Sequence, residues 1–113
     1  MATSEHSNEH SKPERLYENG NHVIMRCPEC NCVQLTYGTS HFLLNWKQFE
    51  HLYRKLKTEA LRIADFPQDY KCFSVPVEHH VARLFLNPAE LEELMEMMTQ
   101  AMLMSSVKNI LRD

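Results

Sequence analysis

The sequence predicts an α+β domain in which an antiparallel sheet is covered by two amphipathic helices. Two apolar stripes with helical spacing each follow a pair of short strand-like segments, and each stripe begins directly after an asparagine, Asn45 or Asn87. The two halves superpose when these asparagines are aligned. With 113 residues, of which 43% are hydrophobic and 24% charged, the chain fits one domain.

The first half begins with strand signals. Residues 22–26 are apolar and include β-branched side chains, and a turn that carries cysteines follows them. Apolar and polar residues then alternate over residues 33–37, which is typical of a half-buried strand. A glycine-containing break precedes a further apolar segment at residues 41–44, so we expect these last two segments to form a hairpin.

A helix is predicted from residue 46 to residue 63. Asn45 is a favourable N-cap, and Gln48 stands three residues later, where a capping box requires it. Apolar side chains then recur at helical spacing and predict one buried face. These residues are Trp46, Phe49, Leu52, Tyr53, Leu56, Ala60 and Ile63.

The second half repeats this order. Residues 70–77 and 81–86 are expected to form two strands joined by a turn. Asn87 is the expected N-cap of a second helix, and Glu90 completes its capping box. The apolar stripe of this helix comprises Leu91, Leu94, Met95, Met98, Ala101 and Met102.

The domain organisation follows from these signals. Residues 1–15 are polar and lack periodicity, so they are expected to form a disordered N-terminal tail ahead of a single domain at residues 16–113. The domain is expected to be a tandem repeat of two β-β-α units, at about residues 20–64 and 69–113. Each unit is too small to close a core alone, so the two should share one interior.

Charge and composition exclude several classes. The net charge of -3, from 12 Lys+Arg and 15 Asp+Glu, argues against general binding to a phosphate backbone. Two glycines cannot build a glycine-rich phosphate loop. Apolar runs fall short of the roughly 18 residues that span a membrane, and the first residues lack a secretory pattern. We therefore expect a cytoplasmic protein that does not bind membranes.

Four cysteines are the candidate metal ligands. Cys27, Cys30 and Cys32 form a C-x-x-C-x-C cluster, and three thiolates within six residues favour tetrahedral zinc. Cys72 is the best fourth ligand, because it lies near the matching part of the second unit. The reserve ligands are His22, His79 and His80. The alternative is that these cysteines are reduced and partly buried, because the second ligand pair of common zinc domains is missing.

Thiol catalysis and structural disulfides are less favoured. A thioredoxin-like C-x-x-C opens a helix, whereas the pair at Cys27 and Cys30 precedes a strand. The expected compartment is reducing, which argues against two permanent disulfides. The sequence contains neither a nucleophile elbow nor H-E-x-x-H, so no residue constellation supports an enzyme.

Two helix surfaces suggest partners. The first helix carries a basic side, and the alternative function that it suggests is nucleic-acid binding. The last helix broadens into a second apolar row after Met98, which suggests self-association as a homodimer. The basic side consists of Lys47, His51, Arg54, Lys55, Thr58 and Arg62.

Residues 30–39, CNCVQLTYGT, followed by Phe42, Leu44 and Phe49, carry one family resemblance. This stretch resembles the start of a family of small uncharacterised Bacteroidetes proteins, a domain of unknown function with a cysteine pair, a strand, an aromatic-glycine turn, a strand and a helix. The resemblance covers mainly residues 27–56 and implies a bacterial cytoplasmic origin, but it supplies no activity. We therefore expect a self-associating binding or regulatory module, with a small zinc-binding protein as one alternative and a nucleic-acid-binding module as another.

Overall fold

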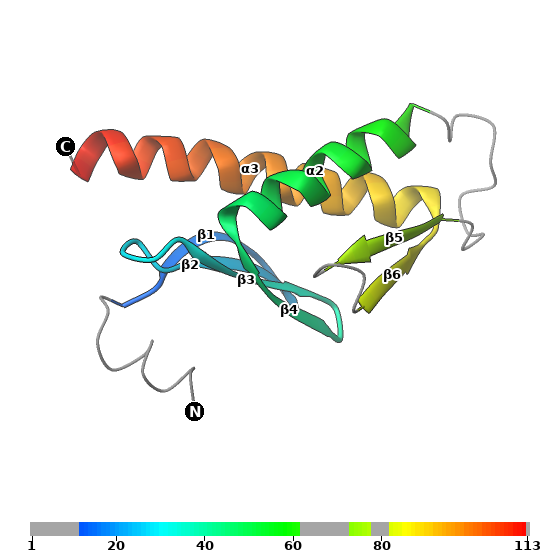
Figure 1. Cartoon of the computed structure of the whole chain (residues 1–113), viewed down its shortest axis with the longest axis horizontal. Coiled ribbons are helices and arrows are strands. Elements are labelled where there is room, and N and C mark those ends of the chain that lie inside the picture. The colour runs from blue at the N-terminus through cyan, green and yellow to red at the C-terminus, as the bar shows by residue number, and fades with distance from the viewer. Residues whose placement is uncertain (1–11, 62–72, 78–81, 113) are drawn as a thin grey trace.

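The computed structural model describes residues 12–61, 73–77 and 82–112 and has the predicted α+β class (Figure 1). Each of the predicted strands and both predicted helices are present, and one further strand precedes them. No helix in the described ranges is long and apolar enough to cross a membrane. The elements are β1 (Glu14–Asn19), β2 (His22–Arg26), β3 (Cys32–Tyr37), β4 (Ser40–Asn45), α2 (Trp46–Ala60), β5 (Phe73–Val77), β6 (Ala82–Leu86) and α3 (Pro88–Arg112).

The strands form two antiparallel sheets rather than the single sheet that the sequence predicted. Strands β1, β2, β3 and β4 pair in chain order, and β5 pairs with β6 as a separate hairpin. In Figure 1, α3 extends over both sheets and α2 crosses it. The two sheets therefore meet through the helices.

Strand β1 corrects the predicted boundary of the tail. It begins at Glu14, inside the segment 1–15 that the sequence assigned to the tail, and pairs with β2. The register shifts between Arg15 and Tyr17, while Leu16 is buried. This irregularity and the polar flanking residues remove the alternation by which strands are recognised. Residues 1–11 of the predicted tail lie outside the described residues.

Both predicted capping boxes are confirmed. The Gln48 backbone N–H donates to Asn45 Oδ1 at 2.7 Å, and the Asn45 N–H donates to Gln48 Oε1 at 2.8 Å. Glu90 and Asn87 make the same two bonds, at 2.7 and 2.9 Å. The tandem repeat as a whole stays a prediction, because the described part of the second half has two strands where the first half has four.

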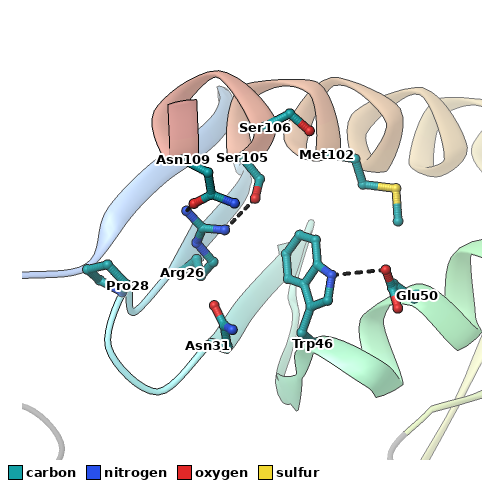
Figure 2. Close-up of a pocket in the computed structure, with 9 residues that line it drawn as sticks. All are labelled: Arg26, Pro28, Asn31, Trp46, Glu50, Met102, Ser105, Ser106 and Asn109. Atoms are coloured by element: carbon teal, nitrogen blue, oxygen red, sulfur yellow. Dashed lines mark hydrogen bonds between the residues drawn. The ribbon is translucent and has the colours of Figure 1, made fainter. Parts of the chain in front are cut away.

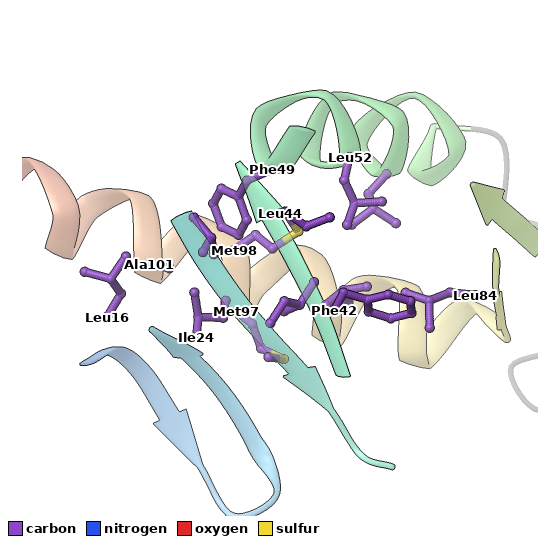
Figure 3. Packing of buried hydrophobic residues seen from close by; sticks show 14 of the residues in the cluster. Leu16, Ile24, Phe42, Leu44, Phe49, Leu52, Leu84, Met97, Met98 and Ala101 are labelled. Atoms are coloured by element: carbon purple, nitrogen blue, oxygen red, sulfur yellow. The ribbon is translucent and has the colours of Figure 1, made fainter. Parts of the chain in front are cut away.

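One hydrophobic core connects β1, β2, β3, β4, α2, β6 and α3 (Figure 3). Phe49 from α2 and Leu91 and Leu94 from α3 are each 0% exposed, while Trp46 packs against the edge of the cluster. The shared interior that the sequence predicted is therefore present. Its remaining buried members are Leu16, Ile24, Val33, Leu35, Phe42, Leu44, Leu52, Leu56, Leu84, Leu86, Met97, Met98 and Ala101.

Substitutions in β6 test whether the hairpin belongs to this core. Leu84 is 5% exposed and its neighbour Phe85 is 61% exposed. We expect Leu84→Ala to lower the free energy of unfolding of the whole chain by about 2–4 kcal/mol, through one cooperative transition. The matched change Phe85→Ala should stay within about 0.5 kcal/mol of the unsubstituted protein. Urea denaturation followed by circular dichroism measures both. Similar losses for the two variants, or a separate early transition, would contradict a common core.

Candidate functional site

A cavity of about 530 Å³ opens between the β2–β3 turn, the start of α2 and the C-terminal half of α3 (Figure 2). The turn contributes Pro28 and Asn31, α2 contributes Trp46 and Glu50, and α3 contributes side chains from residues 102–109. Small-molecule sites commonly have volumes of about 300–1,000 Å³. The cavity is thus large enough for a ligand of metabolite size.

Arg26 forms a fixed, charged part of the cavity wall. Its side chain is 3% exposed, and its guanidinium donates to Glu14 Oε1 at 2.9 Å, to Asn109 Oδ1 at 3.2 Å and to Ser105 Oγ. The Arg26 Cζ atom lies 5.7 Å from the centroid of the Trp46 ring. Arg26 Nε has no hydrogen-bond partner among the described residues. These contacts tie β1, β2, α2 and α3 together around one cation.

Side chains along β2 alternate between the two faces of the sheet, and this alternation places Arg26 on the face toward α3. Ile24 and Arg26 are both buried, two residues apart, and therefore face the same side of the sheet. On α3 the buried row becomes polar after Ala101, because Ser105 follows one turn later and is buried. Asn109, one further turn on, is exposed and accepts a hydrogen bond from Arg26. An inward arginine on the strand therefore meets polar side chains on the helix.

Glu50 supplies the second charge of the cavity wall. Its Oε2 accepts a hydrogen bond from Trp46 Nε1 at 3.0 Å, one turn earlier on α2. Glu50 is half-buried, and the positive charge of Arg26 is already matched by Glu14. The cavity wall therefore contains a cation, Arg26, whose charge is balanced by Glu14, and a second charged group, the carboxylate of Glu50.

A second polar cluster joins the β-sheet to the N-terminal half of α3. Tyr37 donates to Glu93 Oε1 at 2.8 Å, and His22 Nε2 lies 3.4 Å from Glu93 Oε2. The His22 and Tyr37 rings stack with centroids 4.6 Å apart. The Gly38 N–H donates to His22 Nδ1 at 3.0 Å, so the neutral ring carries its proton on Nε2, facing Glu93. The cluster fixes the strands against α3.

Tyr37 makes this cluster sensitive to alkaline pH. Burial, followed by the hydrogen bond to Glu93 and the charges of Glu93 and Glu90, raises the pKa of Tyr37 above its ordinary value. A group whose pKa is raised in the folded state stabilises the fold below its unfolded pKa, here about 10. This contribution is lost as the pH rises further, because the unfolded chain ionises first.

The structure places three of the four predicted zinc ligands around one four-residue turn. Cys27 is buried, Cys30 is exposed and Cys32 is half-buried. The turn is closed by hydrogen bonds of 2.9 Å from the Cys27 N–H to the Cys32 carbonyl and from the Asn31 N–H to the Cys27 carbonyl. Asn31 adopts the left-handed conformation, with φ of 61°.

A complete metal site is not formed within the described ranges. There, no group of three or more histidine, cysteine or acidic side chains is placed to hold a metal ion. Cys72, the predicted fourth ligand, lies outside the described residues, as do His79 and His80, while His22 belongs to the Tyr37 cluster. Zinc binding through Cys27, Cys30, Cys32 and Cys72 stays a prediction.

The basic side of α2 is exposed to solvent. Lys47, Arg54 and Lys55 are all exposed, and Lys57 Nζ lies 5.6 Å from the ring centroid of Tyr53. Arg62 lies outside the described residues. Nucleic-acid binding through this surface stays a prediction.

Sequence reasoning missed the residues that form the cavity. Arg26, Glu50, Ser105 and Asn109 carry no motif, and they are brought together by contacts between distant segments. Two signals were nevertheless present: Arg26 continues the alternation of Ile24, and Ser105 continues a buried helical row. A charged and a polar residue at expected core positions indicate a buried polar contact.

Comparisons with protein families, with curated proteins and with solved structures found no match. The resemblance of residues 27–56 to the Bacteroidetes domain therefore stays a prediction. The function must be argued from the geometry of the chain itself.

Two ion pairs with equal distances test how much burial matters at Arg26. Arg26–Glu14 and Arg15–Glu18 both measure 2.9 Å, but their side chains are 3% and 19% exposed in the first pair and 59% and 51% in the second. We expect Arg26→Met to lower the free energy of unfolding by about 3 kcal/mol, because Glu14, Ser105 and Asn109 lose a shared donor. Arg15→Met should change it by at most about 0.5 kcal/mol. Equal effects in urea denaturation would show that Arg26 does not organise the site.

Proposed function

We propose that this chain is a binding module that holds a small polar molecule with a cationic amine in the Arg26 cavity. The observation that carries the proposal is the carboxylate of Glu50 in the wall of a polar cavity whose other charge, Arg26, is matched by Glu14. A cavity with this balance attracts a cation more strongly than an anion.

The surroundings of Glu50 support an amine. The Trp46 ring in the same wall already lies against one cation, with Arg26 Cζ 5.7 Å from its centroid, and its Nε1 donates to the Glu50 carboxylate. Asn31 and Ser106 are exposed at the cavity and offer amide and hydroxyl groups for the uncharged part of a ligand. An anion, in contrast, would have to compete with Glu14 for the guanidinium of Arg26, which is only 3% exposed.

The single tryptophan provides a direct test. Trp46 is the chain's only tryptophan and lines the cavity, so its fluorescence reports on occupancy. We expect ethanolamine to produce a saturable change in this fluorescence. Ethylene glycol and acetate should bind at least about tenfold more weakly, a difference of about 1.4 kcal/mol in binding free energy. Equal affinity for the three probes, or no saturable change with ethanolamine, would contradict the proposal.

The variant Glu50→Gln sharpens this test. The glutamine amide oxygen can still accept the hydrogen bond from Trp46 Nε1, whereas the charge is removed. We expect the preference for ethanolamine over ethylene glycol to disappear in Glu50→Gln and to persist in the control Glu92→Gln, an exposed position on α3. Preference retained by Glu50→Gln would place the amine elsewhere.

A second candidate function is self-association through the end of α3. Figure 1 shows the C-terminal turns of α3 extending past the start of α2. Met104, Val107 and Leu111 share one face of these turns, at spacings of three and four residues, which is the spacing of paired helices. The exposed fractions are 59% for Leu103, 41% for Met104, 48% for Val107, 72% for Ile110 and 79% for Leu111. We propose a second copy of the same face as the occupant, because an apolar row can complement itself across a twofold axis.

A lysine in this row tests the dimer. Val107 lies in the middle of this row and is 48% exposed, so Val107→Lys should leave the fold intact and shift the mass from dimer to monomer at about 100 μM, since a charge is not tolerated in the centre of an apolar interface. The control Leu61→Lys changes an equally apolar residue that is 87% exposed at the end of α2, and it should leave the dimer unchanged. Light scattering measures both. A monomeric unsubstituted protein would exclude this candidate.

A further inference from the structure

The carboxylate of Glu50 can accept further hydrogen bonds from a ligand in the cavity. Glu50 lines the cavity and is half-buried. Its Oε2 accepts from Trp46 Nε1 at 3.0 Å, and within the described ranges this is the only hydrogen bond or ion pair of the carboxylate. An ionised carboxylate has about four acceptor positions. Most of these positions are therefore open to a donor that the ligand brings.

The same wall offers much less to a cation that cannot donate a hydrogen bond. Proteins recognise quaternary ammonium groups with cages of aromatic rings. Among the described residues that line the cavity, Trp46 alone is aromatic. Its ring already has two protein neighbours, because Arg26 Cζ lies 5.7 Å and the Phe49 ring centroid 5.1 Å from its centroid. In Figure 2 the indole points Nε1 at Glu50. The described wall therefore lacks an aromatic cage.

The two kinds of ammonium approach a carboxylate to different distances. An N–H donor brings the nitrogen to about 2.7–2.9 Å from the oxygen. In a quaternary ammonium the methyl carbons make the contact, at about 3.3–3.6 Å, and the nitrogen lies farther away. The attraction between the two charges falls as their separation grows. Methyl groups also leave the acceptor positions of the carboxylate without a donor once water has been displaced.

We propose that the Arg26 cavity selects ammonium groups that carry at least one N–H over quaternary ammonium groups, and that Glu50 makes this selection. The inference rests on the proposed function, because it specifies the class of amine that the cavity holds. Size does not decide the selection. A cavity of about 530 Å³ lies within the range that holds ligands much larger than a trimethylammonium group.

Two isomeric cations separate hydrogen bonding from charge and size. Choline and protonated N-isopropylethanolamine contain the same atoms and carry the same charge and hydroxyethyl group, but only the second has N–H groups. Each is titrated into the full chain at pH 7 as a competitor of ethanolamine, with Trp46 fluorescence as the readout. We expect choline to bind at least about tenfold more weakly than its isomer, a difference of about 1.4 kcal/mol in binding free energy.

The outcomes distinguish this inference from the proposed function. If ethanolamine binds and choline binds as tightly as its isomer, the cavity recognises charge alone, so the inference is wrong and the proposed function stands. If ethanolamine binds and neither isomer does, the cavity selects by size, and the inference is again wrong. If ethanolamine itself gives no saturable change, both are wrong.

The variant Glu50→Gln assigns the selection to one residue. Glutamine has nearly the same size and can still accept from Trp46 Nε1. We expect the variant to bind N-isopropylethanolamine at least about tenfold more weakly and so to lose its advantage over choline, while the exposed control Glu92→Gln keeps it. Saturation-transfer NMR detects the weak binding, and circular dichroism checks the fold. An unchanged advantage in Glu50→Gln would mean that another acceptor of the wall holds the N–H, and the role of Glu50 would be wrong.

Discussion

The rest of the structure depends on one constraint, the apolar surface of α3, which must be covered on more than one side. Met97 and Met98 are adjacent in sequence and both are 0% exposed, so the helix is enclosed over more than the single stripe of a surface helix. The four-stranded sheet, α2 and the β5–β6 hairpin provide this cover together (Figure 3). Buried residues of the four-stranded sheet and of β6 therefore share one core with α3.

The candidate site lies where this apolar contact ends. Beyond Ala101 the buried row of α3 continues with Ser105, and the strand opposite presents Arg26 instead of another aliphatic residue. A buried cation is tolerated only with partners, and β1 supplies the essential one, Glu14. Strand β1 is therefore part of the site as well as of the sheet: without it the charge of Arg26 would lose its counterion, and the base of the cavity would no longer be neutral.

Features encoded by near neighbours could be predicted from the sequence, whereas features encoded by distant contacts could not. The caps at Asn45 and Asn87 join residues three positions apart, and the stripes of both helices repeat within one or two turns, so these signals are local. Strand β1 lacks such a signal because its irregular register interrupts the alternation. The cavity joins Arg26 to Asn109, 83 residues later, and no local pattern encodes such a contact.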